Sequence, residues 1–210
     1  MSNTHVVEVD EALLARTLDC YFPHVRYLKN AQVEYTDGGN SFPSEIGPCV
    51  AIGRGSFAAP PAWYIQSTGH FNAIEFNLAY NQLAYVLLAQ CVDSQALPLL
   101  SAHVPKGEFH SRMLGDILIL KYSVAFHKAM DASTFQARLI VQKTMERGGL
   151  VFLKTHCRVS ANVDDAHHAS WSSRGDVLLA VVQSEATTAK ATDQVRRAPD
   201  PKFGYAPSGA

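Results

Sequence analysis

The sequence predicts an α+β domain in which an antiparallel sheet wraps around one long, buried helix. Residues 72–90 contain neither proline nor glycine and are apolar on nearly every helical face, which is typical of a helix enclosed by other elements. A long helix followed by a run of strands is the pattern of an α+β fold. The strand-like segments are rich in Ile, Leu, Val and Phe and comprise residues 116–126, 134–143, 150–161 and 176–183.

The N-terminal part of the chain predicts a short helix and then extended segments. In residues 10–20 three leucines recur at the spacing of an amphipathic helix, and Asp10 is placed to cap its first turn. After this helix the composition favours extended structure in residues 31–35, 48–52 and 62–66, with Gly and Pro between them.

The chain is predicted to form a single domain over residues 10–184. A length of 210 residues with 47% hydrophobic side chains is sufficient for one sizeable core. Residues 1–9 are polar and are expected to be flexible, and residues 185–210 contain few aliphatic side chains and are expected to form a disordered tail. Gly148 and Gly149 separate two strand-like segments and predict a tight turn.

Charge and hydropathy exclude several classes of function. The formal net charge of −1 provides no basic field to recruit nucleic acid. The most apolar stretch, residues 71–92, is interrupted by Asn, Gln and Glu, which argues against a membrane span. The N-terminus lacks the apolar core of a signal peptide, so we expect a cytoplasmic protein.

The spacing of cysteine and histidine predicts no metal site. The four cysteines are scattered without a CxxC pair and are expected to be reduced. His167 and His168 follow Asp164 and Asp165. These residue types can bind a metal ion, but adjacent residues rarely chelate one ion together. We therefore expect neither a metal nor an organic cofactor.

Residues 64–75 join a predicted strand to the long helix and contain the candidate catalytic groups. Gly69 permits a backbone turn that other residues resist. The helix begins close to Asn72, and a helix N-terminus stabilises negative charge, including the oxyanion that forms when an acyl carbonyl is attacked. Glu75 in the first turn is a candidate general base, and His70 is a candidate donor of a hydrogen bond or a proton.

Each of these residues has a structural alternative. Asn72 and Glu75 have the spacing of a capping box, a role that does not exclude catalysis. His70 before a helix and Tyr64 in a strand are both common as structural residues. Tyr64 and Asn81 are otherwise candidates to position an acyl group. A polar amide such as Asn81 in a buried helix needs a hydrogen-bond partner, from a neighbouring strand or from a second subunit.

The run YIQSTGHFNAIEFNLAYNQLAY, residues 64–85, resembles the central motif of the FcoT-like family of acyl thioesterases. The resemblance covers this motif well and residues 10–160 more weakly. It extends to Arg26-Tyr27-Leu28 and, in the later strands, to Lys121, Ser123, Phe126, Lys128, Phe135 and Ala137-Arg138-Leu139. It implies a single hot-dog domain, an α+β fold in which a long central helix is wrapped by an antiparallel sheet.

The resemblance implies roles for several residues. The catalytic tyrosines and asparagine suggested for the family fall on Tyr64 and Asn72, and more loosely on Tyr21. Glu75 falls near the catalytic carboxylate of many hot-dog thioesterases, and His70 completes the predicted catalytic set. The residues expected to bind substrate are Tyr21, Arg26, Tyr27, Lys29, Gly69, Phe71, Ala73, Asn81, Lys121 and Arg138.

Members of this family in natural-product pathways resemble two-step enzymes. The amine of glycine adds to the β-carbon of a 2-enoyl thioester on an acyl carrier protein, and hydrolysis then releases an N-carboxymethyl-3-amino acid. Glu75 is the candidate to accept the amine proton, the helix N-terminus to hold charge on the thioester oxygen, and His70 to protonate C2. The glycine carboxylate requires a cation. The candidates are Arg26, Lys29, Lys121 and Arg138.

Two alternatives to this two-step reaction stay open. One is a simple thioesterase acting on acyl-CoA or an acyl carrier protein, and the other is a hot-dog protein that binds acyl groups without catalysis. A polar pocket for an amino acid favours addition, whereas an entirely apolar tunnel favours hydrolysis alone. Hot-dog domains commonly pair through their sheets, so the resemblance also implies a homodimer or higher homo-oligomer with active sites at the shared interface.

Overall fold

The computed structural model describes residues 3–61, 70–161 and 171–182. The strands are β1 (Thr4–Glu8), β2 (Leu28–Thr36), β3 (Phe42–Ser44), β4 (Gly47–Cys49), β5 (Ala51–Ala58), β6 (Ile117–Phe126), β7 (Thr134–Arg147), β8 (Leu150–Ser160) and β9 (Ser173–Val181). The α-helices are α1 (Glu11–Leu18), α2 (Ala73–Asp93), α3 (Pro98–His103) and α4 (Phe109–Asp116). Two short 3₁₀ helices span Pro23–Val25 and Asp37–Gly39.

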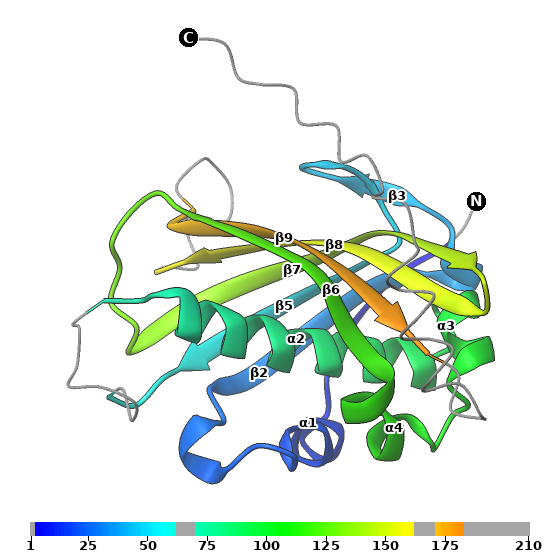
Figure 1. Cartoon of the computed structure of the whole chain (residues 1–210), viewed down its shortest axis with the longest axis horizontal. Helices are drawn as coiled ribbons and strands as arrows, with labels where there is room; N and C mark the ends of the chain where they lie inside the picture. Colours follow the sequence, from blue (N-terminus) through cyan, green and yellow to red (C-terminus); the bar gives the residue numbers. More distant parts are fainter. Residues whose placement is uncertain (1–2, 62–69, 162–170, 183–210) are drawn as a thin grey trace, which may run out of the picture.

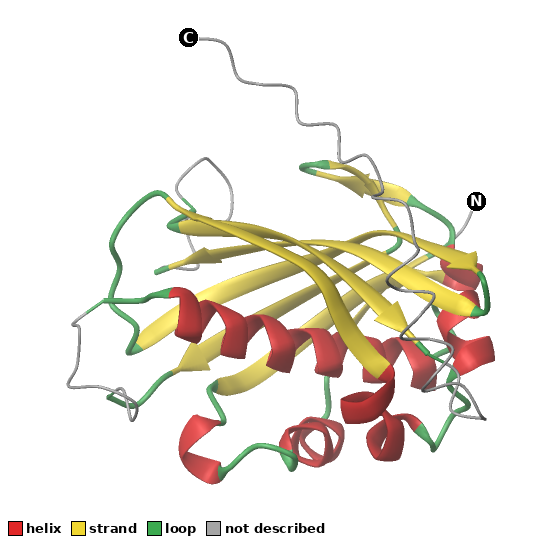
Figure 2. Cartoon of the chain, in the orientation of Figure 1, coloured by secondary structure: helices red, strands yellow, loops and turns green. Residues whose placement is uncertain are grey.

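The fold is an α+β hot-dog arrangement, with one curved sheet wrapped around α2 (Figure 1). In the described residues the sheet has seven antiparallel strands in the order β1-β2-β5-β7-β8-β9-β6, and β3 and β4 form a separate hairpin. Figure 2 shows that the helices lie on the concave side of the sheet and the hairpin on the opposite side. No described helix is long and apolar enough to cross a membrane.

Helix α2 is the centre of the hydrophobic core. Of its 21 residues 13 are buried, and glycines in the sheet let two strands approach it closely. An added Cβ at Gly53 of β5 would lie 2.8 Å from Leu87 Cδ1, and one at Gly175 of β9 would lie 2.9 Å from Phe76 Cζ. Larger residues at these two positions would therefore push the sheet away from the helix.

A buried amide in α2 ties the helix to the start of β2. The Gln82 side chain is fully buried. Its Oε1 accepts hydrogen bonds from the backbone N–H groups of Tyr27 and Leu28, both at 2.9 Å, and its Nε2 donates to the Val25 carbonyl at 2.7 Å. One side chain thus satisfies three backbone groups where the chain turns from a 3₁₀ helix into the sheet.

The structure confirms most of the predicted elements. The predicted helix at 72–90 is α2, which extends to Asp93, and the four predicted C-terminal strands are β6 to β9 with boundaries shifted by a few residues. Asp10 caps α1 by accepting a 2.8 Å hydrogen bond from the Leu13 N–H. Gly148 and Gly149 form the predicted turn, with φ angles of 60° and 76°.

Other elements differ from the prediction or lie outside it. Residues 4–8, predicted as part of a flexible N-terminus, form β1, because their backbone pairs with β2 in an antiparallel register that places Val7 opposite Val33. Helices α3 and α4 and the β3–β4 hairpin were not predicted, since each is short and depends on packing against distant elements. The extended segment predicted at 62–66 lies outside the described residues.

Replacing Gln82 by Met is expected to destabilise the fold by about 2–3 kcal/mol, because the shape is kept while three buried backbone groups lose their partner. Urea unfolding followed by circular dichroism measures the change. The matched control is Gln90→Met in the same helix, where the side chain is partly exposed and the change should be close to neutral. An equal loss in both variants would show that Gln82 has no special role.

Candidate active site

A pocket of about 380 Å³ lies at the N-terminal end of α2. Its wall comes from the residues that lead into the helix and from the loop that follows β6, two segments that lie together at the same end of the molecule (Figure 1). We call it the terminal pocket. It is lined by His70, Phe71, Asn72, Ala73, Phe126, His127, Lys128 and Ala129.

Backbone hydrogen bonds fix both walls of the terminal pocket. The Phe71 N–H donates to the Met130 carbonyl at 2.8 Å, which joins the approach to α2 to the loop after β6. The same loop is joined to the start of β9, since the N–H groups of His127 and Lys128 donate to the Ser172 carbonyl at 2.8 and 3.2 Å. The pocket is therefore built into the fold by three segments distant in sequence.

The first turn of α2 is closed by a capping box. The Asn72 side chain accepts a 2.8 Å hydrogen bond from the Ile74 N–H, and the Glu75 carboxylate accepts one of 3.1 Å from the Asn72 N–H. This confirms the structural alternative for both residues. Glu75 is only 4% exposed and does not line the terminal pocket, whereas Asn72 does.

The remaining predicted residues of the central motif are distributed around the terminal pocket. His70 and Ala73 are exposed residues of its wall. Phe71 is buried and packs edge-to-face on Phe135, with ring centroids 4.9 Å apart, so that it forms an aromatic floor. Tyr64 and Gly69 lie outside the described residues.

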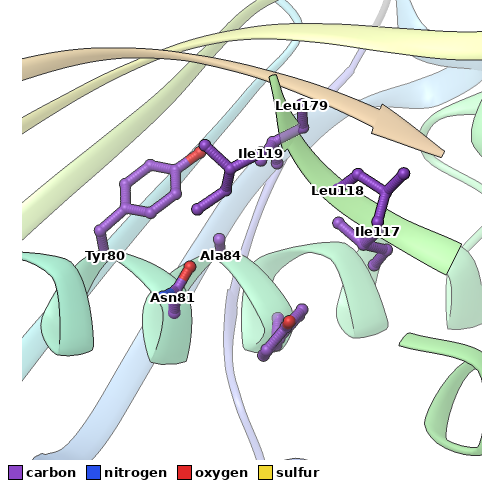
Figure 3. Close-up of a pocket in the computed structure, with 8 residues that line it drawn as sticks. Tyr80, Asn81, Ala84, Ile117, Leu118, Ile119 and Leu179 are labelled. Atoms are coloured by element: carbon purple, nitrogen blue, oxygen red, sulfur yellow. The ribbon is translucent and has the colours of Figure 1, made fainter. Parts of the chain in front are cut away.

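A second pocket, of about 230 Å³, lies further along α2 (Figure 3). It separates α2 from β6, and we call it the seam pocket. Its walls are mostly apolar and are formed by Tyr80, Asn81, Ala84, Tyr85, Ile117, Leu118, Ile119 and Leu179. From Ala73 to Asn81 the helix advances about 12 Å at 1.5 Å per residue, so the two pockets lie along one seam between α2 and β6.

Aromatic rings lie between the two pockets. Tyr122 of β6 packs edge-to-face against Phe76 and Tyr80 of α2, with centroid distances of 6.2 and 6.4 Å. The Tyr80 hydroxyl forms a 2.8 Å hydrogen bond with Thr155, whereas the buried Tyr122 hydroxyl has no partner among the described residues. Burial raises the pKa of both phenols and so favours their neutral form.

Asn81, predicted to position an acyl group, does face the seam pocket (Figure 3). Its Nδ2 donates to Asn77 Oδ1 one turn earlier, at a long distance of 3.4 Å. The partner expected for this amide is therefore supplied within the same helix. Tyr21 lies near Tyr85 of α2, and burial raises the pKa of Tyr21. Tyr27 is buried in the core at 1% exposure.

The four cations predicted to hold a carboxylate do not line either pocket. Arg26 forms an ion pair with Asp19 at 3.0 Å, and Lys29 donates to the Arg26 carbonyl at 2.9 Å. Lys121 is an exposed residue of β6. Arg138 alternates along β7 with buried Ala137 and Leu139, so it points to the face of the sheet opposite α2.

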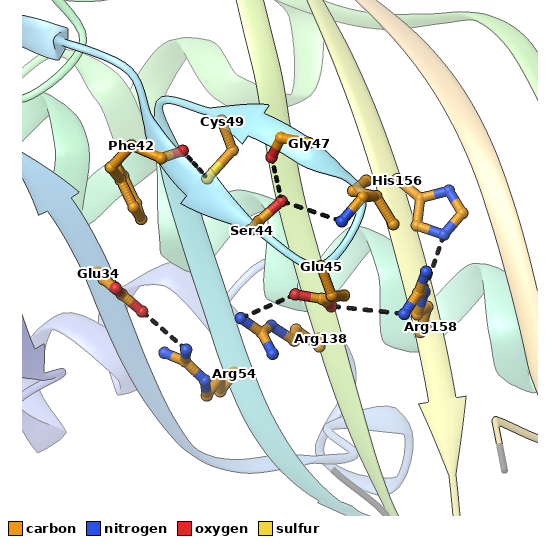
Figure 4. A network of polar contacts seen from close by, with 11 residues as sticks. Glu34, Phe42, Ser44, Glu45, Gly47, Cys49, Arg54, Arg138, His156 and Arg158 are labelled. Carbon is orange, nitrogen blue, oxygen red and sulfur yellow. Dashed lines mark hydrogen bonds and ion pairs between the residues drawn. The ribbon is translucent and has the colours of Figure 1, made fainter. Parts of the chain in front are cut away.

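Arg138 belongs to a polar network on that outer face, shown in Figure 4. Glu45, at the turn of the β3–β4 hairpin, accepts ion pairs from Arg138 at 3.1 Å and from Arg158 at 3.6 Å. His156 of β8 contacts Asp176 at 2.8 Å, and this hydrogen bond holds the pKa of that carboxyl below its usual value. The network fastens the hairpin to the sheet and is remote from both pockets.

Lys128 and His127 are pocket residues that the sequence did not assign to the site. Lys128 is one of the residues that carry the family resemblance. The structure shows that it comes two residues after the end of β6 and lines the terminal pocket. The available signal was its place in the short polar stretch between two predicted strands. No group of three or more potential metal ligands occurs among the described residues, and His167 and His168 lie outside them.

Comparison with known proteins finds relatives that share one name. The chain is 33% identical over 147 residues to a (2E)-enoyl-[ACP] glycyltransferase of Streptomyces coeruleorubidus, covering 69% of this chain and 82% of that protein. It is 33% identical over 185 residues to a protein of the same name from Mycobacterium tuberculosis H37Rv, covering 87% of this chain and 92% of the relative.

The solved structures that resemble this chain are more distant in sequence. A proposed thioesterase from Syntrophus aciditrophicus is 14% identical, with a TM-score of 0.46 over 82% of this chain and 97% of that one. A Staphylococcus aureus protein solved in complex with CoA is 9% identical, with a TM-score of 0.40 over 62% of this chain and 69% of that one.

The family assignment follows from the sequence match. The model of the FcoT-like thioesterase domain matches residues 16–181, which include both pockets and every described strand of the sheet except β1. The chain belongs to the FcoT-like thioesterase family.

Proposed function

We propose that this protein adds the amine of glycine to the β-carbon of a 2-enoyl thioester on an acyl carrier protein and then hydrolyses the thioester. The proposal is supported by the names of the relatives, which are (2E)-enoyl-[ACP] glycyltransferases. The observation that carries it is the terminal pocket, where polar and basic side chains gather at one end of an apolar seam. Such a site accommodates an amino acid at one end and an acyl chain at the other.

The proposed reaction has two steps at one site. The amine nitrogen bonds to C3, the electron pair of the double bond moves toward the thioester oxygen, and the proton lost by the amine is returned at C2. Water then adds to the carbonyl carbon and the thiol leaves. Glu75 accepts the amine proton, His70 delivers a proton to C2, and the start of α2 at Asn72 stabilises the charged oxygen in both steps. Tyr64 and Gly69 complete the proposed set.

The three described residues with proposed roles lie at different depths relative to the terminal pocket. His70 and Asn72 line the terminal pocket and are within reach of a bound substrate. Glu75 lies one helical turn further in, where its carboxylate already accepts the Asn72 N–H. Its proposed role as a base therefore requires that the same carboxylate serve both the cap and the proton transfer.

Glu75→Gln separates these two roles, because Gln at this position also completes a capping box. We expect glycine-dependent product to fall by about 10²–10⁴-fold, while thermal stability changes little. Mass spectrometry of products from a short 2-enoyl thioester, with and without glycine, measures the effect. Glu11→Gln, the same change in the exposed first turn of α1, is the matched control and should be silent.

This assay has two outcomes that decide between the functions and one that decides the role of Glu75. An N-carboxymethyl-3-amino acid that appears only with glycine supports addition. Free enoic acid regardless of glycine contradicts it and leaves a simple thioesterase, which the family description favours as the second candidate. Full activity of the Glu75→Gln variant would show that Glu75 serves only in the capping box and not in catalysis.

The seam pocket is proposed to hold the acyl chain. Ala84, which is buried and lines this pocket, is a small residue between larger ones. Ala84→Leu should reduce kcat/KM for a ten-carbon thioester by about tenfold or more, since the variant fills space that a long chain needs. The four-carbon thioester on the same variant is the internal control and should react normally. Equal losses on both substrates would place the acyl chain elsewhere.

We also propose that the protein is a homodimer joined along β6. In the described residues β6 is an outer strand of the sheet, and Leu118, Ile119 and Phe126 are 37%, 42% and 45% exposed. An exposed apolar edge strand favours pairing with another chain. Because β6 lines both pockets, a second copy there would help to enclose them.

Light scattering tests the dimer through its mass, expected at twice the 22.9 kDa of one chain. Ile119→Lys should shift the equilibrium toward monomer, because a charge at the paired edge opposes association. The matched control is Val6→Lys on β1, the opposite edge of the sheet, where Val6 is 57% exposed. A monomeric wild type at micromolar concentration would contradict the proposal.

A further inference from the structure

The terminal pocket has the charge of an anion-binding site. Three of its wall residues, Lys128, His70 and His127, carry side chains that hold a positive charge when protonated, and none of the described residues that line it is acidic. The nearest acid in the loop after β6, Asp131, is turned back onto Ser133, accepting hydrogen bonds from its N–H at 2.8 Å and its hydroxyl at 2.7 Å. This pairing lowers the pKa of Asp131 and keeps its charge on the loop.

Lys128 is the lysine of this wall. Its backbone is held by the Ser172 carbonyl at 3.2 Å, and the loop around it is joined to the approach to α2 by the hydrogen bond from Phe71 to Met130. Among the described residues its side chain forms no ion pair. A lysine fixed at the rim of a pocket without an acidic partner is available to an anionic ligand.

Two of the other candidate cations are paired with carboxylates away from the pocket. Arg26 is paired with Asp19, and Arg138 is paired with Glu45 on the outer face of the sheet. The structure therefore leaves Lys128 as the lysine or arginine that lines the terminal pocket in the described residues.

We propose that Lys128 binds the carboxylate of the amino acid substrate and makes the reaction selective for amino acids over simple amines. The inference rests on the proposed function. In glycine one carbon separates the carboxylate from the amine, so a cation that holds the carboxylate also fixes the amine beside the start of α2, where the thioester carbonyl is proposed to bind. A charge-assisted hydrogen bond of this kind orients the nucleophile and lowers the KM for glycine.

The same pocket charge could also receive the phosphodiester of the carrier's pantetheine arm. The carboxylate is favoured because the phosphodiester lies at the far end of that arm from the thioester, whereas the amine and its carboxylate must be next to the reacting carbon. A thioester of N-acetylcysteamine carries no phosphate and separates the two sources of negative charge.

The test is steady-state kinetics of wild type, Lys128→Met and Lys128→Arg with a 2-enoyl N-acetylcysteamine thioester, varying glycine or glycinamide. We expect Lys128→Met to raise the KM for glycine by about 10–100-fold, and Lys128→Arg to restore part of the loss. The KM for glycinamide, which has the amine but no carboxylate, should be unchanged. Lys143→Met, an exposed lysine at the other end of β7, is the control.

Distinct results overturn distinct claims. An unchanged KM for glycine in Lys128→Met, with normal addition by wild type, contradicts the role of Lys128 and leaves the proposed function intact. If the variant raises the KM for the thioester only when the acyl group is on the carrier protein, the lysine binds the phosphodiester. That result also contradicts the role of Lys128 in binding glycine. Absence of any glycine adduct from wild type overturns the proposed function and this inference with it. Melting curves of both variants confirm that they are folded.

Discussion

Enclosure of α2 by the sheet is the constraint on which the rest of the structure depends. A helix with most of its residues buried has no solvent to satisfy its polar side chains, so each must find a partner inside the protein. Gln82 meets this requirement by binding three backbone groups at the start of β2, and Tyr80 does so through Thr155 of β8. The sheet is thereby fixed to the helix at two points, and glycines in β5 and β9 set how closely it approaches.

The two pockets lie along the side of α2 that stays partly exposed. Ile74 is 43% exposed, and Asn81 and Tyr85 are partly exposed. These residues lie on one side of the helix at intervals of seven and four residues, which is the spacing of a single helical face. Strand β6 runs along this face, and the two pockets lie between them. The proposed chemistry lies at the end where the helix begins, because the basic side chains that line the two pockets in the described residues, His70, His127 and Lys128, are found there.

The sequence predicted the elements whose signals are local, and the structure added those that depend on tertiary contacts. Nothing near Gln82 in the sequence indicates that its partners are more than fifty residues away, and nothing local to residues 4–8 indicates that β2 pairs with them. Three residues of the central motif, His70, Asn72 and Ala73, line a pocket, and their roles stay predictions. The outward direction of Arg138 follows from its alternation with buried apolar residues along β7.

The treatment of cations differs between the two faces of the sheet. On the outer face, Arg54, Arg138 and Arg158 are direct neighbours across three strands. Adjacent like charges repel, and the fold offsets the repulsion with carboxylates, pairing Glu34 with Arg54 and Glu45 with both other arginines.

At the terminal pocket no described carboxylate forms an ion pair with Lys128, and the oxygens of Asp131 in the same loop are bound to Ser133. A cation whose counter-charge is built into the fold stabilises structure, because its charge is already neutralised where it stands. A cation that forms no ion pair within the described part of the chain can obtain a counter-charge from a ligand. By this criterion the arginines of the outer face are structural, and the lysine at the start of the seam fits the proposed role in binding substrate.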